Sequence, residues 1–247
     1  MLKHTTLWAA VAGLVFALAP AAQAALMGEL GILDLTANGG NNPATGAPWA
    51  LGDTYRFAFH TSASRTAQSA DIADYNAWVH GLANAAGLGA ATWKVIGSTD
   101  AVDARDNTST NVAVNGTGEA IFLLDGSTIV ANDYTDLWDG AIQNPIGITE
   151  LGTAWTFWPW TGTARDGTAA PGLGAHGNPL GINEVNQGQA SVTTNWITRI
   201  NTYDPYGNLL PMYGMSDPLE IVPEPATLAL LSIGGLGLAI RRRRVRG

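Results

Sequence analysis

One segment of the chain alternates apolar and polar positions with period two. Between residues 53 and 60, the aromatic side chains fall on one face and Arg56 falls on the opposite face. This alternation predicts a half-buried strand, with its aromatic side toward the core. The aromatic residues are Tyr55, Phe57 and Phe59.

A second segment has a helical period. Ser69 or Asp71 can cap its first turn, and Gly87 follows its last residue. We therefore predict one main helix over Ser69–Ala86. Its apolar face is predicted to consist of Ile72, Tyr75, Val79, Leu82 and Ala86.

Short apolar runs predict the strands of an α+β domain with long loops. The turn sequence Asp125-Gly126 follows one of these runs. Residues 161–194 are instead rich in Gly, Pro, Asn and Thr and show no period, which indicates a loop that is either functional or disordered. The remaining strands are predicted at residues 26–35, 91–97, 120–124, 195–200 and 209–213.

The first 24 residues have the order of a secretory signal peptide. Lys3 precedes an apolar run at residues 7–18, and Ala22-Gln23-Ala24 supplies small residues before Ala25. The apolar run is too short to span a hydrocarbon layer of about 30 Å. We therefore expect a signal peptidase to remove residues 1–24 and to release an extracytoplasmic domain that begins at Ala25.

The last 26 residues predict a membrane-spanning tail. Residues 226–240 carry no charge, and this apolar run is close to the length that a helix needs to cross a bilayer. Clustered arginines stay on the cytoplasmic side and stop transfer, so the preceding domain is expected to face outward. The stop-transfer residues are Arg241, Arg242, Arg243 and Arg244.

The domain between the two ends, residues 25–221, is acidic and has no cysteine. It contains six Lys and Arg residues against nineteen Asp and Glu residues, a net charge of −13. A surface of this sign disfavours nucleic acid and anionic lipid as partners. Without disulfides the domain depends on its core, and its eight tryptophans supply large apolar side chains for a single domain.

The sequence Val222-Pro223-Glu224-Pro225, followed by the apolar run and the arginines, resembles the PEP-CTERM sorting signal of Gram-negative bacteria. The two prolines favour an extended segment and remove two amide donors, so we expect it to stay out of helices and sheet interiors. The resemblance implies an exosortase-type sorting enzyme as partner. It also implies transient anchoring in the inner membrane, followed by release to the cell surface or the medium.

The domain itself resembles the endostatin-type branch of the C-type-lectin-like fold. The resemblance implies a binding scaffold with a long loop, here residues 163–194. The usual disulfides of that family are absent, and residues 155–160 look like an insertion. The matching blocks are Asp74–Ala77, Ala85–Leu88, Trp93–Ile96, Phe122–Gly126, Leu137–Gly140, Trp160–Thr163 and Asn195–Ile197.

Trp158, Asp166 and Glu184 are the candidate ligand-binding residues. Aromatic faces stack on sugar rings, and alternation from Trp155 predicts that Trp155 and Phe157 are buried while Trp158 points outward. Asp166 and Glu184 lie in the long loop, where they could supply hydrogen-bonding groups. A neutral sugar is therefore the favoured ligand.

Catalytic and metal-binding residues are not predicted. The chain has no Cys, no Gly-x-Ser-x-Gly elbow and no paired histidines, and its histidines are expected at surface or capping positions. Calcium binding stays an alternative, since two sets of aspartates recur every third residue, although neither fits an EF-hand. The two sets are Asp100, Asp103 and Asp106, and Asp133, Asp136 and Asp139.

Together these features favour an exported cell-surface or matrix protein with a binding or structural role, associated with exopolysaccharide, and not an enzyme. One alternative is a secreted glycan hydrolase, which needs two carboxyl groups facing each other across a cleft. Another is a purely structural matrix subunit that has no small ligand.

Overall fold

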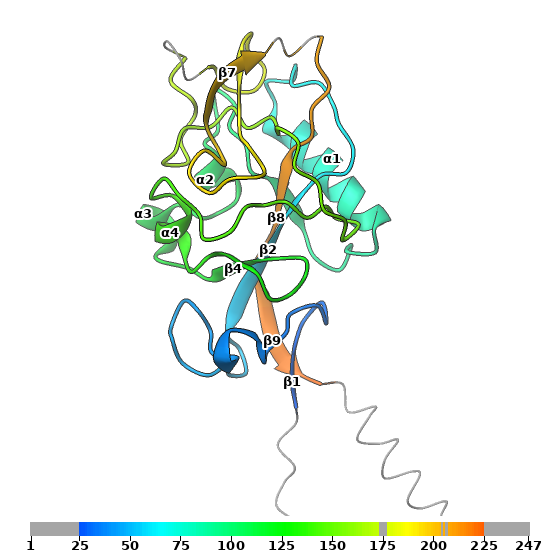
Figure 1. Cartoon of the computed structure of the whole chain (residues 1–247), viewed down its shortest axis with the longest axis vertical. Coiled ribbons are helices and arrows are strands. Elements are labelled where there is room, and N and C mark those ends of the chain that lie inside the picture. Colours follow the sequence, from blue (N-terminus) through cyan, green and yellow to red (C-terminus); the bar gives the residue numbers. More distant parts are fainter. Residues whose placement is uncertain (1–24, 173–176, 204, 206, 225–247) are drawn as a thin grey trace, which may run out of the picture.

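The strand β2 (Thr54–His60) lies at the centre of a seven-stranded sheet in the computed structural model, which describes residues 25–172, 177–203, 205 and 207–224 (Figure 1). One edge of β2 pairs in parallel with β4 (Ala120–Leu123). The other edge is shared by two antiparallel strands, β8 (Tyr213–Ser216) and β9 (Leu219–Pro223). The sheet is completed by β5 (Ile129–Ala131) on β4, β3 (Trp93–Val95) on β8 and β1 (Leu26–Gly28) on β9.

The predicted main helix is confirmed as α1 (Ile72–Ala85). Asp71 caps it by accepting a hydrogen bond from the Ala73 amide, and Gly87 follows its end with a φ of 86°. The buried side chains Tyr75, Val79 and Ala83 pack this helix against β3 and β8. The α+β class is therefore confirmed, whereas the likeness to C-type-lectin-like folds stays a prediction.

The prediction that β2 is half-buried is wrong, because both of its faces are covered. Tyr55, Phe57 and Phe59 lie in the core cluster that includes the α1 side chains, and Ala58 lies in a second cluster on the opposite face of the sheet. Side chains of two short helices, α2 (Ala104–Asn107) and α4 (Tyr134–Leu137), belong to that second cluster. The other short helices, η1 (Ala37–Gly40) and α3 (Val112–Asn115), bury none of their residues.

Residues 161–194 are not simply a loop, because they contain β6 (Val185–Gln187). This strand pairs with β7 (Arg199–Tyr203) in a separate two-stranded sheet. Gly162 has a φ of 60°, and a Cβ atom there would lie 2.4 Å from the Leu180 amide nitrogen, so the close approach requires glycine. Buried Asn186 ties the segment together by donating to the Thr163 carbonyl at 2.7 Å and to the Thr198 hydroxyl at 2.9 Å.

The predicted element bounds at both ends of the domain need correction. Only Leu26–Gly28 of the segment 26–35 is a strand, and β8 begins at Tyr213, where the predicted strand 209–213 ends. β9 was not predicted at all. The signal peptide predicted at residues 1–24 and the membrane helix predicted at residues 226–240 lie outside the described residues. None of the helices in the part of the chain that the structure describes has the length and apolar character needed to cross a bilayer.

Arg56 explains how a charged residue can occupy the centre of the sheet. Its side chain is 1% exposed, and Nε donates to Glu119 at 3.1 Å and to the Tyr134 hydroxyl at 2.8 Å. Its Nη1 donates to the carbonyls of Thr108 and Ser216. The Tyr134 hydroxyl in turn donates to Glu119. Burial raises the pKa of Tyr134, so the hydroxyl keeps its proton and can donate.

We predict that Arg56→Ala lowers the free energy of unfolding by about 3–5 kcal/mol, because it leaves the Glu119 carboxylate and two carbonyls without their partner. Urea unfolding followed by tryptophan fluorescence measures the change. Arg165→Ala is the control, since Arg165 is exposed and contacts Asn195 there; this change should alter stability by no more than about 0.5 kcal/mol. Equal losses in both variants would contradict the prediction.

Candidate functional site

The two ends of the described domain pair with each other at its base, as neighbouring strands of the seven-stranded sheet. β1 pairs with β9 in the register Leu26 to Pro223 and Met27 to Val222. Beyond the last pair, the Glu224 amide donates to the Ala25 carbonyl at 2.7 Å. Ala25 is the residue expected to begin the chain after signal-peptide removal, and Glu224 is the acidic residue of the Val-Pro-Glu-Pro sequence. Both ends therefore leave the domain at one place (Figure 1).

This sequence was expected to stay out of helices and sheet interiors, but Val222 and Pro223 end β9 and pair with β1, and Pro225 lies outside the described residues. Ile221, the residue before the motif, also bonds on the edge of β9 that faces away from β1, where its amide donates to the Asp53 carbonyl at 2.8 Å. Pro223 is the last residue of β9, and its missing amide donor disrupts no internal ladder at that position. Pro223 is exposed, while Val222 and Glu224 are half-buried.

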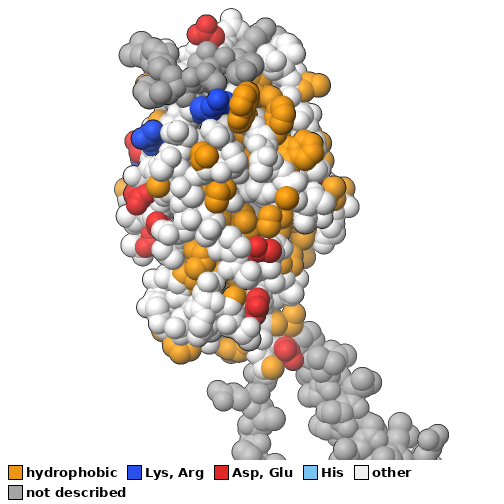
Figure 2. Space-filling view, viewed as in Figure 1, with side chains coloured by type: hydrophobic (Ala, Val, Ile, Leu, Met, Phe, Trp, Pro, Cys, Tyr) orange, Lys and Arg blue, Asp and Glu red, His pale blue; other side chains and the backbone are white. Residues whose placement is uncertain are grey.

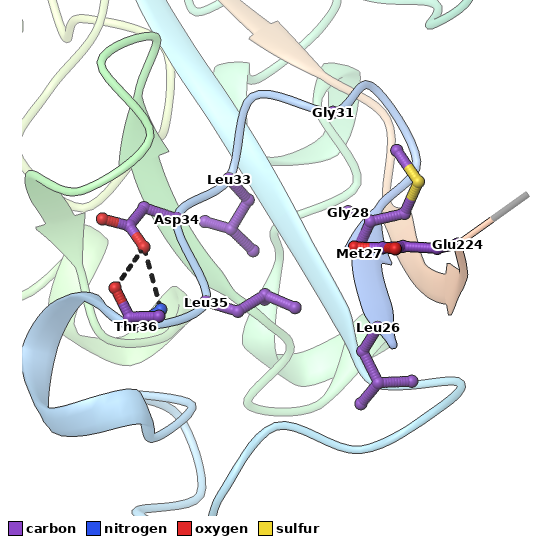
Figure 3. Close-up of a pocket in the computed structure, with 9 residues that line it drawn as sticks. All are labelled: Leu26, Met27, Gly28, Gly31, Leu33, Asp34, Leu35, Thr36 and Glu224. Carbon is purple, nitrogen blue, oxygen red and sulfur yellow. Dashed lines mark hydrogen bonds between the residues drawn. The ribbon is translucent and has the colours of Figure 1, made fainter. Parts of the chain in front are cut away.

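A pocket of about 490 Å³ opens beside Glu224 (Figure 3). Leu33 and Leu35 project into it from the loop that follows β1, and Asp34 lies between them in the chain. Asp34 Oδ1 accepts hydrogen bonds from the Thr36 hydroxyl at 2.7 Å and the Thr36 amide at 2.9 Å. These bonds lower the pKa of Asp34 below its usual value, so the carboxylate is charged. The other lining residues are Leu26, Met27, Gly28 and Gly31.

The conformation of this loop depends on the turn between β4 and β5. The Asp34 amide donates to the Gly126 carbonyl at 3.0 Å. Gly126 has a φ of 78°, and a Cβ atom at this position would lie 2.1 Å from the Ile32 carbonyl oxygen. The predicted Asp125-Gly126 turn is therefore confirmed, and its glycine also lets the pocket loop pack against the sheet.

The base of the domain is acidic. Residues 25–55 and 217–224 contain no Lys or Arg, whereas Glu29, Asp34, Asp53, Glu220 and Glu224 all belong to these segments. On the face drawn in Figure 2, the basic side chains lie in the upper half and acidic ones appear in the lower half. The pocket therefore combines an apolar lining with negative charge.

Comparison with protein families identifies the motif at the C-terminal end of the chain. Residues 222–244 match the family model of the PEP-CTERM protein-sorting motif. The chain carries a PEP-CTERM sorting motif. This match supports export, transient membrane anchoring and processing by an exosortase-type enzyme. A search of the curated proteins found no match. Of the PEP-CTERM residues, Val222, Pro223 and Glu224 belong to the described domain, and Pro225 and the arginines lie outside it.

A second candidate site lies at the opposite end of β2, on residues 154–158. Here the sequence-based prediction is reversed, because Trp155 is 44% exposed and Phe157 is 50% exposed. The predicted alternation is wrong as well, because residues 154–157 are all exposed and Pro159 and Trp160 are both buried. Trp160 is fully buried and donates from Nε1 to the Arg65 carbonyl at 2.9 Å. Trp155 and Phe157 therefore belong to an exposed stretch that enters the core only at Pro159 and Trp160.

Trp158 is half-buried and stacks against a cation. The guanidinium of Arg199, at the start of β7, lies 4.0 Å from the centre of the Trp158 ring. The rings continue outward from this pair, with 6.3 Å between the centroids of Trp158 and Phe157 and 6.5 Å between those of Phe157 and Trp155. The sequence indicated aromatic residues here, but it gave no sign that Arg199 would join them.

Asp166 is held by hydrogen bonds from its neighbour Thr168, whereas the Glu184 residue is exposed. Asp166 Oδ1 accepts from the Thr168 hydroxyl at 2.6 Å and stabilises a tight turn. Burial acts to raise the pKa of Asp166, but the Thr168 bonds and the charge of Arg105 outweigh it and lower the pKa. Glu184 precedes β6 with a φ of 59°. The three predicted ligand residues therefore stand on three different segments of the domain.

The regularly spaced aspartates serve as caps and turns. Asp133 caps α4, and Asp103 accepts from the Ala169 amide at 2.7 Å. Asp106 accepts from the Asn111 side chain, and Asp136 accepts from the Asn132 amide and Gln143. Within the described part of the chain, no three His, Cys, Asp or Glu side chains come together in a way that could hold a metal ion.

His60 connects the core to the exposed aromatic residues. It was expected at the surface, but it is fully buried, with Nε2 at 3.3 Å from the Phe157 carbonyl and Nδ1 at 3.0 Å from the Thr61 carbonyl. Burial lowers the pKa of His60 to about 4 and outweighs the two carbonyl contacts, which act to raise it. The ring is therefore neutral at pH 7 and donates to one carbonyl only.

We predict that His60 makes the domain less stable in mild acid. Between pH 6.5 and about pH 4, the unfolded chain binds a proton at this residue and the folded protein does not, so stability falls as the pH is lowered. The full effect is about 3 kcal/mol. Urea unfolding at several pH values should give a flatter pH profile for His60→Gln than for the wild type. A His60→Gln profile with the wild-type slope would contradict the prediction.

Proposed function

We propose that the mature protein is a cell-surface or matrix protein of a Gram-negative bacterium that binds exopolysaccharide through the exposed aromatic residues Trp155 and Phe157. The observation that carries the proposal is their exposure at 44% and 50%. Large aromatic side chains in a soluble domain are normally buried, and an exposed apolar group of this kind commonly marks a binding surface. Trp158 and Arg199 continue the same surface.

The chemistry of this surface favours a sugar. Residues 154–157 line a shallow hollow of about 370 Å³, and the aromatic planes of Trp155 and Phe157 are inclined by 39° to one another. Two aromatic faces at this spacing can each contact an apolar ring face of a polysaccharide. Arg199 stacks on Trp158 and can donate hydrogen bonds to hydroxyl groups. The overall acidity of the domain supports a neutral glycan as ligand.

We propose a binding role without catalysis or a cofactor. A glycan hydrolase needs a carboxyl group whose pKa is raised, so that it stays protonated and can act as the acid. The pKa values of Asp34, Asp125 and Asp166 are instead lowered by hydrogen bonds that outweigh any effect of burial. Glu119 and Asp217 line one pocket of about 400 Å³, but they form ion pairs with Arg56 and Lys94.

The binding proposal predicts that Trp155→Ala and Phe157→Ala each weaken retention on exopolysaccharide from the native cells. One aromatic contact is worth about 1 kcal/mol, which corresponds to about a fivefold loss of affinity. Trp158→Ala and Asp166→Ala test the residues that the sequence suggested. The measurement is affinity electrophoresis of the purified protein in gels that contain the polysaccharide.

Leu51→Ala provides the matched control, because Leu51 is 62% exposed but lies near the base of the domain. It should migrate as the wild type does. If the wild type is not retarded, the purely structural reading replaces binding. If the aromatic variants are retarded as strongly as the wild type, the binding surface lies elsewhere.

Processing gives a separate prediction. Mass spectrometry of protein from the native cells should find a new C-terminus close to Pro223-Glu224-Pro225. Glu224→Ala should increase the uncut, membrane-bound fraction, because it removes the only charge of the motif ahead of the arginines. Extracellular protein that still contains Arg244 would contradict the assignment of the tail.

A further inference from the structure

The PEP-CTERM motif begins inside the folded domain. The match starts at Val222, yet Val222 and Pro223 are the last two residues of β9 and pair with Met27 and Leu26. Glu224 is bonded through its amide to Ala25, and it lines the basal pocket. The first part of the motif is therefore a structured surface rather than a free linear peptide.

The geometry restricts how an enzyme can bind the first three residues of the motif. The neighbours of Val222–Glu224 are Leu26, Met27 and the pocket loop of residues 31–36. A protein that contacts the Glu224 side chain in the folded domain also meets these neighbours, because they line the same pocket (Figure 3). Recognition of the motif and contact with the base of the domain are therefore physically linked.

We propose that the basal pocket is a docking surface for the exosortase-type enzyme. The enzyme contacts Val222–Glu224 together with β1 and the 31–36 loop, while β1 and β9 stay paired. The inference rests on the PEP-CTERM match. The lining specifies the partner, since Leu26, Leu33 and Leu35 accept an apolar side chain and Glu224 attracts a basic one, while Asp34 adds negative charge on the outer side of the same loop (Figure 3). The enzyme surface that faces the domain therefore carries an apolar projection beside a positive charge.

Charge argues against the membrane itself as the occupant. Anionic lipid headgroups attract basic segments, and the segments that form the base have acidic residues and no Lys or Arg. The place of the pocket favours the sorting enzyme, because the remainder of the matched motif leaves the domain at Glu224, directly beside it. A tail in the membrane thus brings this face of the domain close to a membrane enzyme.

The first test compares two matched aspartates in the full chain, expressed in the native cells. Asp34→Asn keeps the hydrogen bonds to Thr36 but removes the charge from the outer side of the pocket loop (Figure 3). Asp166→Asn makes the same change where Asp166 bonds to Thr168 in the same way, away from the base. Pulse-chase labelling should show processing slowed at least threefold by Asp34→Asn and unchanged by Asp166→Asn.

A second pair tests the apolar part of the pocket. Leu35→Glu should slow processing at least fivefold, and Leu151→Glu, at a site 62% exposed and outside the pocket, should not. Limited proteolysis of the uncut chains checks folding, and the aspartate pair decides the matter if Leu35→Glu misfolds. Normal processing of Asp34→Asn and of folded Leu35→Glu overturns the proposal. An unprocessed wild type would instead contradict the sorting assignment itself.

A third test asks whether the base stays closed during recognition. The Glu29 amide bonds to the Glu220 carbonyl at 3.0 Å, one step beyond the Gly28 to Ile221 pair, and the chain has no cysteine of its own. Glu29→Cys with Glu220→Cys should form a disulfide that locks β1 to β9. We expect processing within twofold of a Glu29→Ser, Glu220→Ser control. A block that a reductant relieves would mean that the base must open, which overturns the proposal.

Discussion

Complete burial of β2 is the constraint on which the rest of the structure depends. Both faces of the strand are covered and both of its edges are paired, so each layer of the domain is positioned against it. Arg56 can occupy this position only because Glu119, Tyr134 and two carbonyls satisfy its guanidinium. Such a buried pair adds little net stability, but loss of one partner leaves a buried charge unpaired.

The parts that the sequence predicted correctly are those governed by local chemistry. The α1 helix, the Asp125-Gly126 turn and the strand at β4 follow from spacing, caps and turn residues within a few positions. The second face of β2 could not be predicted, because it is covered by segments far away in the chain. β6 was missed for a related reason, since Asn186 and the threonines around it are buried polar groups whose partners only the fold brings together.

The same distinction between local and long-range interactions explains which features of the candidate sites could be predicted from sequence. Alternation failed for Trp155 and Phe157, because residues 154–157 are all exposed and the segment enters the core only at Pro159 and Trp160, where Trp160 bonds to the distant Arg65 carbonyl. The sorting motif was found from sequence because its chemistry is local. Its pairing with β1 was not, because residues 26–28 and 221–223 lie at opposite ends of the domain sequence, and no local pattern connects them.

β2 also determines how the two sites relate to each other. Its first residue pairs with Glu220 near the base, and its last residue, His60, contacts the Phe157 carbonyl. Seven strand residues span about 20 Å, and the strand is fixed on both edges. The aromatic residues are therefore held away from the end at which the tail leaves the domain. The proposed glycan-binding surface and the end that carries the sorting motif therefore lie at opposite ends of β2, so the two proposed interactions do not compete for one surface.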